Sequence, residues 1–166
     1  YDMGSATTVT DAAVSQSPKV ILIPSDALIG QTRMRIAVNY GSYPTLCTTN
    51  FDGEVEDYTI NVVAPVLTTG TITGSSYTPN QSISVPFTVT GAFRAGNIFT
   101  AQLSDANGSF ANPVTIGTLS GTGSGTIIAT IPAGAVAGAG YRIRVVASNP
   151  SVTAADNGTN ITILGP

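Results

Sequence analysis

An acidic cluster is the densest group of side chains in this protein that could do chemistry. Within the run 52–57, DGEVED, four of the six residues carry a carboxylate. Successive side chains of an extended strand point to opposite faces, so we expect Glu54 and Glu56 on one face and Asp57 on the other. Glu56 then shares a face with apolar neighbours such as Tyr58. A carboxylate there must be paired, coordinated or at the rim of the fold, because burying it alone is costly.

Three interpretations of this cluster are open. In the first, Glu54, Glu56 and Asp57 contribute to a calcium site, since Ca²⁺ prefers several carboxylate and carbonyl oxygens. In the second, Asp57 forms ion pairs with Arg33 and Arg35 across a strand ladder. In the third, two of the carboxylates act as a glycosidase pair. No aromatic-lined cleft is predicted around them, which makes catalysis the least favoured of the three.

The composition excludes most enzyme chemistry. The sequence holds no histidine and one cysteine, which rules out Ser-His-Asp and Cys-His nucleophiles, histidine-containing metal sites and zinc sites of several thiolates. Gly121–Gly125 is interpreted as a turn rather than a phosphate loop. We therefore expect no enzyme and no cofactor, unless calcium binds. Cys47 is interpreted as a free thiol, an intermolecular partner or an inert loop residue.

The balance of residue types is typical of extracellular β-modules. Only 9% of the 166 residues are charged, against about 25% in average soluble proteins. The net charge of −3 offers no basic surface for nucleic acid or anionic lipid. No apolar run is long enough to enter a membrane. We expect a secreted or cell-surface protein.

Period-two alternation places the acidic cluster in a pair of strands. Residues 32–40 and 56–63 both alternate, and we expect them to pair antiparallel so that the face of Arg33 and Arg35 meets Asp57. Upstream, the apolar run 20–23 predicts a short strand buried on both sides.

A second and more regular series of strands follows a boundary near Ala64-Pro65-Val66. About seven alternating strands with turn signals between them predict an immunoglobulin-like β-sandwich. Pro86 interrupts one strand on its outward side, and since proline cannot donate to a ladder we expect that strand at a sheet edge. The prediction is an all-β protein of two antiparallel β-sandwich modules in tandem, 1–64 and 65–166.

The first module resembles the C-terminal part of the GEVED domain, which is named for the string present here at 53–57. Tyr58-Thr59 and the upstream Arg-x-Arg strand also fit. The resemblance covers residues 1–63 and implies a large secreted protein of Bacteroidota, exported by type IX secretion. The acidic loop of the domain's N-terminal half is missing here. The resemblance therefore implies a truncated module in which Glu54, Glu56 and Asp57 supply only part of a calcium site.

The second module is similar to an immunoglobulin-like repeat of the same class of proteins, most specifically in the run YRIRVVAS at 141–148. Such repeats act as stalks, spacers, filaments or adhesive arms. The expected partners are neighbouring modules or protein chains, through open β-edges or head-to-tail contacts.

The alternative function is a carbohydrate-binding accessory module of a secreted polysaccharide-degrading enzyme or protease, with glycans as partners. Sugar platforms use exposed aromatic rings, and the sequence has no tryptophan. The candidate rings lie in loops or at strand ends: Tyr40, Tyr43, Tyr77, Phe93 and Phe110. The favoured interpretation is that each of them caps the core or packs against a loop. Arg142 and Arg144 are interpreted as solubilising residues on a solvent face.

Overall fold

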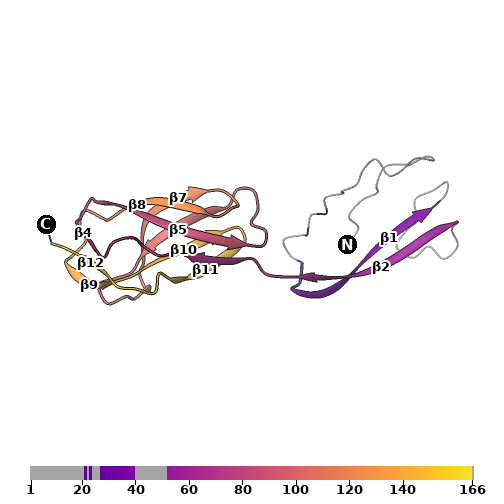
Figure 1. Ribbon diagram of the computed structural model, residues 1–166, viewed down its shortest axis with the longest axis horizontal. Coiled ribbons are helices and arrows are strands. Elements are labelled where there is room, and N and C mark those ends of the chain that lie inside the picture. The colour runs from indigo at the N-terminus through magenta and orange to yellow at the C-terminus, as the bar shows by residue number, and fades with distance from the viewer. Residues whose placement is uncertain (1–20, 22, 24–26, 40–51, 166) are drawn as a thin grey trace. The chain divides into compact units, whose positions relative to one another are not determined.

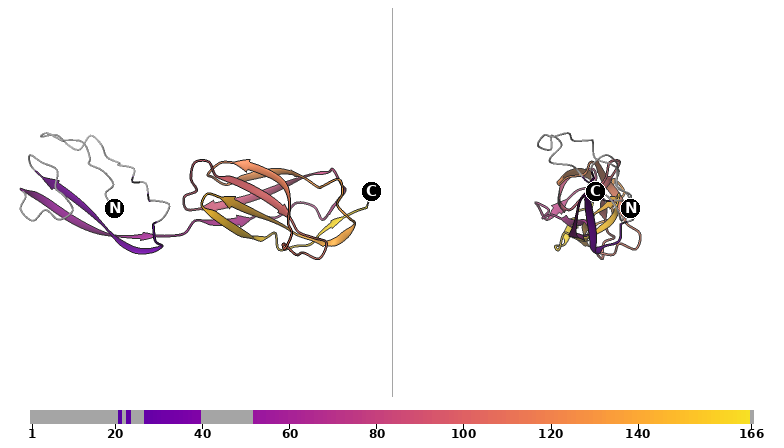
Figure 2. Two further views of the ribbon diagram at one scale, coloured as in Figure 1. Left: turned by 180° about the vertical axis from the view of Figure 1, so that it is seen from behind. Right: turned by 90° about the vertical axis from the view of Figure 1, so that its right-hand side faces the viewer.

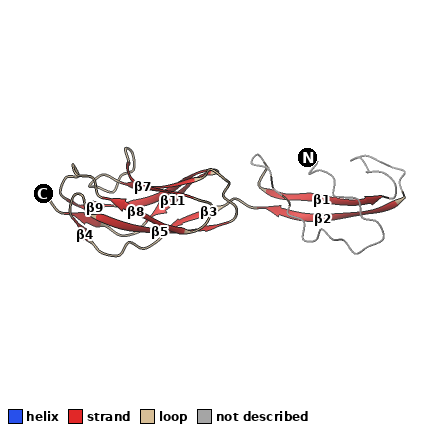
Figure 3. Ribbon diagram, turned by 90° about the horizontal axis from the view of Figure 1, so that it is seen from above, coloured by secondary structure: helices blue, strands red, loops and turns tan. Residues whose placement is uncertain are grey.

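The computed structural model describes residues 21, 23, 27–39 and 52–165. The protein divides into two compact units, Tyr1–Val63 and Ala64–Pro166. The regular structure of the described residues consists of strands, with no helix among them (Figure 3). The all-β prediction is therefore confirmed.

The described part of the first unit is an antiparallel hairpin (Figure 1). Strand β1 (Gly30–Asn39) pairs with β2 (Gly53–Val62), from Gly30 opposite Val62 to Asn39 opposite Gly53, without a shift in register. The predicted pairing is confirmed. Its physical basis is the alternation of both sequences, because a slip of one residue would turn every apolar side chain to the opposite face.

The apolar face of this hairpin is less covered than expected. Met34 and Ile60 are half-buried, and Ile36 and Tyr58 are exposed. Ile21 and Ile23, from the run predicted to be a buried strand, lie outside strands and are 39% and 40% exposed. That part of the prediction is wrong for these two residues. The expectations for Tyr40, Tyr43 and Cys47 concern residues that lie outside the described ones.

The second unit is built from ten strands in three sheets (Figure 1). One sheet has the order β3-β5-β8, another β11-β10-β6-β7, and a small third sheet β4-β12-β9. All neighbours are antiparallel except β4 and β12, which are parallel. The bounds are β3 Val66–Thr69, β4 Ser76–Tyr77, β5 Ser82–Thr90, β6 Ile98–Leu103, β7 Val114–Ser120, β8 Gly125–Thr130, β9 Gly138–Tyr141, β10 Ile143–Ser148, β11 Ser151–Asp156 and β12 Ile161–Ile163.

The two larger sheets pack face to face, and their inward side chains form the core. Every second residue of the central strands is buried, as the alternation predicts. The ring of Phe87 on β5 lies 4.4 Å from that of Phe99 on β6, and Phe93 packs edge-on against Phe99 at 5.3 Å. The inward set is Ile83, Val85, Phe87, Phe99, Ala101, Leu103, Ile127, Ala129, Ile143, Val145 and Ala147.

Buried polar side chains join the two sheets at their margins. Thr69 at the end of β3 donates its hydroxyl to the carbonyl of Ala155 at 2.8 Å, and accepts from the backbone N–H of Val145 at 3.0 Å. Asn97, only 1% exposed, joins three loops at one end of the sandwich. Its Nδ2 donates to the carbonyl of Gly121, and its Oδ1 accepts from the N–H groups of Ser148 and Asn149.

The prediction that Pro86 marks an edge strand is wrong, because β5 lies centrally between β3 and β8. The carbonyl of Pro86 accepts from the N–H of Gly70 at 2.8 Å. In an antiparallel ladder the N–H and C=O of one residue point to the same side. The missing N–H of Pro86 therefore faces Gly70, one residue beyond the end of β3, where no strand ladder is interrupted.

Gly70 approaches Pro86 so closely that adding a side chain at position 70 should destabilise the second unit. A Cβ at Gly70 would lie 2.9 Å from the Pro86 carbonyl oxygen and 3.0 Å from its Cγ. We expect Gly70→Ala to lower the free energy of unfolding by about 1–3 kcal/mol, the usual cost of overpacking. The matched control is Gly123→Ala, where a Cβ meets no heavy atom within 4 Å. Urea unfolding followed by circular dichroism measures both, and equal midpoints would contradict the packing described here.

Candidate functional site

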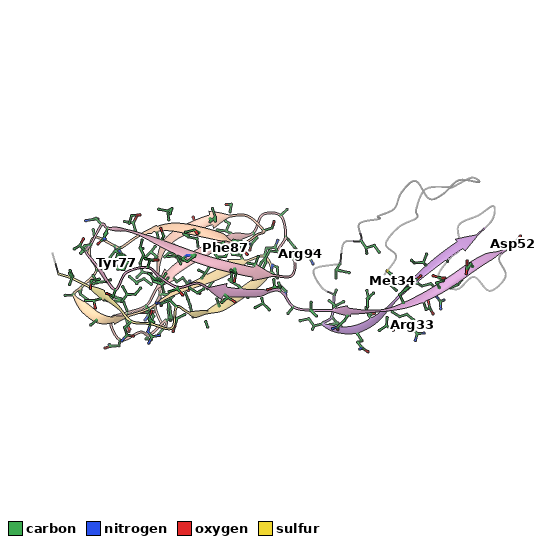
Figure 4. All side chains as sticks on the ribbon, in the orientation of Figure 1. Arg33, Met34, Asp52, Tyr77, Phe87 and Arg94 are labelled. Atoms are coloured by element: carbon green, nitrogen blue, oxygen red, sulfur yellow. The ribbon has the colours of Figure 1, made fainter. Side chains whose placement is uncertain are left out.

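The hairpin separates the acidic cluster into two groups. Glu54 and Glu56 lie opposite Val38 and Ile36, on the apolar face, whereas Asp57 lies opposite Arg35 on the polar face. Figure 4 shows Arg33 and Met34 on opposite sides of the hairpin, as the alternation requires. The prediction of which side chains share a face is therefore confirmed for these residues.

The carboxylate of Asp57 is held by arginine. Arg35 donates to it with both arms of its guanidinium, Nε to Oδ1 at 2.8 Å and Nη2 to Oδ2 at 3.0 Å. Arg33 lies farther away, with Nη1 3.7 Å from Oδ2, and its side chain is 73% exposed. The Arg35 hydrogen bond, opposed by some desolvation and aided by the charges of Arg35 and Arg33, lowers the pKa of Asp57 from its ordinary value. The ion-pair interpretation is thus confirmed for this residue.

The other acidic residues have a different environment. Tyr58 donates its hydroxyl to Oε2 of Glu56, two residues away on the same face. This bond raises the pKa of Tyr58, and the negative charge of Glu56, some desolvation and the charge of Glu54 add to it. Glu56 is therefore satisfied by a local hydrogen bond at an exposed position, and neither glutamate is buried.

The hydrogen bonds of Asp57 and Glu56 argue against a calcium site formed by the described residues. Ca²⁺ takes six to eight oxygen ligands, and Asp57 points away from Glu54 and Glu56 with both oxygens bonded to Arg35. Over residues 27–39 and 52–165, with the isolated residues 21 and 23, no three His, Cys, Asp or Glu side chains gather as a metal would require. The described residues therefore do not fit a calcium site by themselves.

A second polar group, which sequence reasoning missed, surrounds Arg142 in the sandwich unit. Its Nε donates to Oδ1 of Asn160 at 2.7 Å, and its Nη1 donates to Oδ1 of Asp156 at 3.1 Å. These residues line an open polar depression of about 260 Å³ together with Asn107, Gly108 and Gly140. The sequence signal for this group was the turn 156–160. Arg142 lies between β9 and β10, and β11, which the sequence did not predict, brings that turn beside it.

The interpretation of Arg142 and Arg144 as merely solubilising residues is incomplete. Both point outward, as expected, but each is engaged by neighbours. Arg144 donates from Nε to Gln102 at 2.9 Å, and its guanidinium carbon lies 4.4 Å from the centre of the Phe110 ring. A guanidinium over an aromatic face is attracted by the ring's negative potential. The two arginines thus connect neighbouring segments on the outside of this unit, Arg142 with Asp156 and Asn160, and Arg144 with Gln102 and Phe110.

The structure describes three of the five aromatic residues proposed for a sugar platform, and each of the three is buried or half-buried. Tyr77 and Phe93 are each only 6% exposed and belong to the core. Burial raises the pKa of Tyr77, whose hydroxyl bonds the carbonyl of Thr73. Phe110 is half-buried, with Arg144 over its ring. The favoured interpretation, that these rings cap the core, is confirmed for Tyr77 and Phe93.

Comparison with known protein families finds a match for the first unit. Residues 1–61 match the family model of the GEVED domain, which confirms the resemblance over 61 of the 166 residues. The second unit lies outside this match. No curated protein matches the sequence. Among the described residues, no helix is long and apolar enough to cross a membrane.

The pairing of Asp57 can be tested by titration. We expect Arg35→Gln to raise the pKa of Asp57 toward its ordinary value, because the Arg35 hydrogen bond is the largest cause of the lowering. Arg33→Gln, the matched control, removes only a weaker charge and should shift the pKa less. The carboxyl carbon signal of Asp57, followed by NMR against pH, reports both. Equal shifts in the two arginine variants would contradict the assignment.

The same pairing has a consequence for stability. A carboxylate with a lowered folded-state pKa contributes stability above its unfolded pKa and loses it as the pH falls through the folded value. We therefore expect the hairpin to weaken in acid, as the pH falls below the ordinary aspartate pKa of 3.8. Asp57→Asn should remove that dependence, and acid titrations of both proteins followed by NMR measure it. An unchanged acid dependence in the variant would show that another group is responsible.

Proposed function

We propose that this protein is a non-catalytic structural segment of a secreted bacterial surface protein, in which the second unit is an immunoglobulin-like spacer of a stalk or filament. The match of residues 1–61 to the GEVED domain supports a place in a larger extracellular protein. The architecture of the second unit supports the spacer role, since its two larger sheets are antiparallel and pack face to face, as in immunoglobulin-like modules of about 100 residues. Bacteroidota and the type IX route are part of the same proposal.

The observation that carries the proposal is the path of the backbone through the second unit. The backbone enters through β3 at one end of the sandwich and leaves through β12 at the opposite end (Figures 1 and 2). A module with its two termini far apart adds its full length to a stalk and transmits tension along its long axis. A module with adjacent termini would project sideways instead.

Both terminal strands are tied to the sandwich in a geometry that suits tension. The strand β3 pairs with β5 from Val66 opposite Thr90 to Thr69 opposite Phe87. At the other end, Thr162 N–H donates to the carbonyl of Ser75, and Leu164 N–H donates to that of Tyr77, both at 2.8 Å. Pulling along these strands would load their ladder bonds together rather than one at a time, because the bonds join each strand sideways to its neighbour, perpendicular in the antiparallel β3–β5 pair and slanted in the parallel β4–β12 pair.

Adhesion would then come from neighbouring modules or protein chains that contact this one by strand edges or end to end. The carbohydrate-binding alternative loses support from the burial of Tyr77 and Phe93, and no observation in the described residues favours it over the spacer.

The spacer proposal predicts a mechanical effect of the C-terminal tie. We expect Leu164→Pro to lower the force at which the second unit unfolds, because proline removes the N–H that bonds Tyr77. Leu164→Ala is the matched control, since it shortens the same exposed side chain and keeps the N–H. Single-molecule pulling on the whole protein through its two ends measures the force.

Two outcomes are decisive. A lower force for Leu164→Pro than for Leu164→Ala, with similar circular dichroism spectra, supports load transmission through β12. Identical forces in the two variants would show that the tie does not bear load, and would count against the spacer.

A further inference from the structure

The sandwich unit contains both Asn-Gly dipeptides of the sequence, Asn107-Gly108 and Asn157-Gly158. Both lie in turns, where Gly108 and Gly158 adopt φ values of +84° and +72°. An asparagine followed by glycine can cyclise, because the next backbone nitrogen can attack Cγ of the asparagine amide and glycine presents no side chain in its way. Whether this occurs depends on how firmly the folded protein holds the two reacting groups.

Both polar atoms of the Asn157 side chain are hydrogen-bonded. Its Oδ1 accepts from the backbone N–H of Ile143 at 2.9 Å, and its Nδ2 donates to the carbonyl and the hydroxyl of Thr159 at 2.7 and 3.1 Å. The nitrogen that would attack, that of Gly158, donates to the carboxylate of Asp156 at 2.7 Å. Cyclisation at this position would require all of these bonds to break.

The side chain of Asn107, in contrast, is exposed and lacks such hydrogen bonds among the described residues, through either Oδ1 or Nδ2. Gly108 N–H donates to the carbonyl of Asp105 at 3.1 Å, a longer bond to a neutral acceptor. Hydrogen bonds to charged groups are stronger than those to neutral ones, so the nitrogen of Gly108 is freed more easily than that of Gly158.

We propose that Asn107 is a site of spontaneous deamidation and that Asn157 is protected from it by the fold. The Gly108 nitrogen attacks Cγ of Asn107, a new C–N bond forms, and the bond between Cγ and Nδ2 breaks. Nδ2 leaves as ammonia, taking up the proton that Gly108 loses, and a cyclic imide remains. Water then opens the imide at either carbonyl and yields aspartate or isoaspartate, with no oxidant or reductant involved.

The modification would change the depression around Arg142. Asn107 lines it together with Arg142, Asp156 and Asn160, so a carboxylate at 107 adds a second acid beside the guanidinium. The isoaspartate product also lengthens the backbone of a tightly packed turn. A Cβ on Gly140 would lie only 2.4 Å from the carbonyl oxygen of Ala106, the residue before Asn107.

The test compares the two asparagines within one molecule. The whole protein is incubated at mildly alkaline pH, in native buffer and in urea, and then cleaved after arginine. Asn107 and Asn157 fall in separate peptides, because Arg142 and Arg144 lie between them, and mass spectrometry measures the conversion of each. In native buffer we expect Asn157 to react at least about tenfold more slowly than Asn107, the factor that the loss of several modest hydrogen bonds implies.

In urea we expect the two rates to converge, because the protection is lost with the fold. Asn107→Gln is the matched control, since it keeps the amide and should abolish conversion in the peptide that contains residue 107 under native conditions. Equal native rates at the two positions, or faster reaction at Asn157, would overturn the proposal. No conversion of Asn107 in native buffer, with conversion in urea, would also overturn it.

Discussion

The packing of two β-sheets through their apolar faces is the constraint on which the second unit depends. The contact between Phe87 and Phe99 lies at its centre, and aliphatic side chains from β5, β6, β8 and β10 surround it. Removing a buried phenylalanine side chain typically costs about 3–5 kcal/mol, a large part of the stability of a small domain. The positions of the loops and of both terminal strands follow from that packing.

Polar groups fulfil a different task from the core: they join elements at the margins. Asn97 satisfies three backbone groups at one end, Thr69 connects β3 to the facing sheet, and Arg142 joins Asp156 and Asn160 near the other end. In the first unit, Arg35 and Asp57 join β1 to β2. A protein with only 9% charged residues thus uses several of its described charges in such contacts.

The alternating strands could be predicted from the sequence because each buries one face, and the register of β1 with β2 followed from the same pattern. The strand β11 was missed because SVTAAD contains a single buried residue, Ala154, and is defined by its pairing with β10 rather than by its own pattern. Pro86 led to the wrong prediction of an edge strand. Its missing N–H faces Gly70, beyond the end of β3, and the sequence alone does not show which neighbour a proline faces. The roles of Asn97 and Arg142 depend on loops that meet only in three dimensions, so no local signal could reveal them.

We propose that β12 is tied to the sandwich as firmly as the core strands, so that the module can transmit tension between its opposite ends. Native-state hydrogen exchange of the whole protein, read residue by residue, tests it most directly. We expect the amides of Thr162 and Leu164, which bond Ser75 and Tyr77, to exchange in the same slow class as those of β5 and β10. Rapid exchange at these two residues, with the core still protected, would mean that the C-terminal strand frays independently and does not carry load.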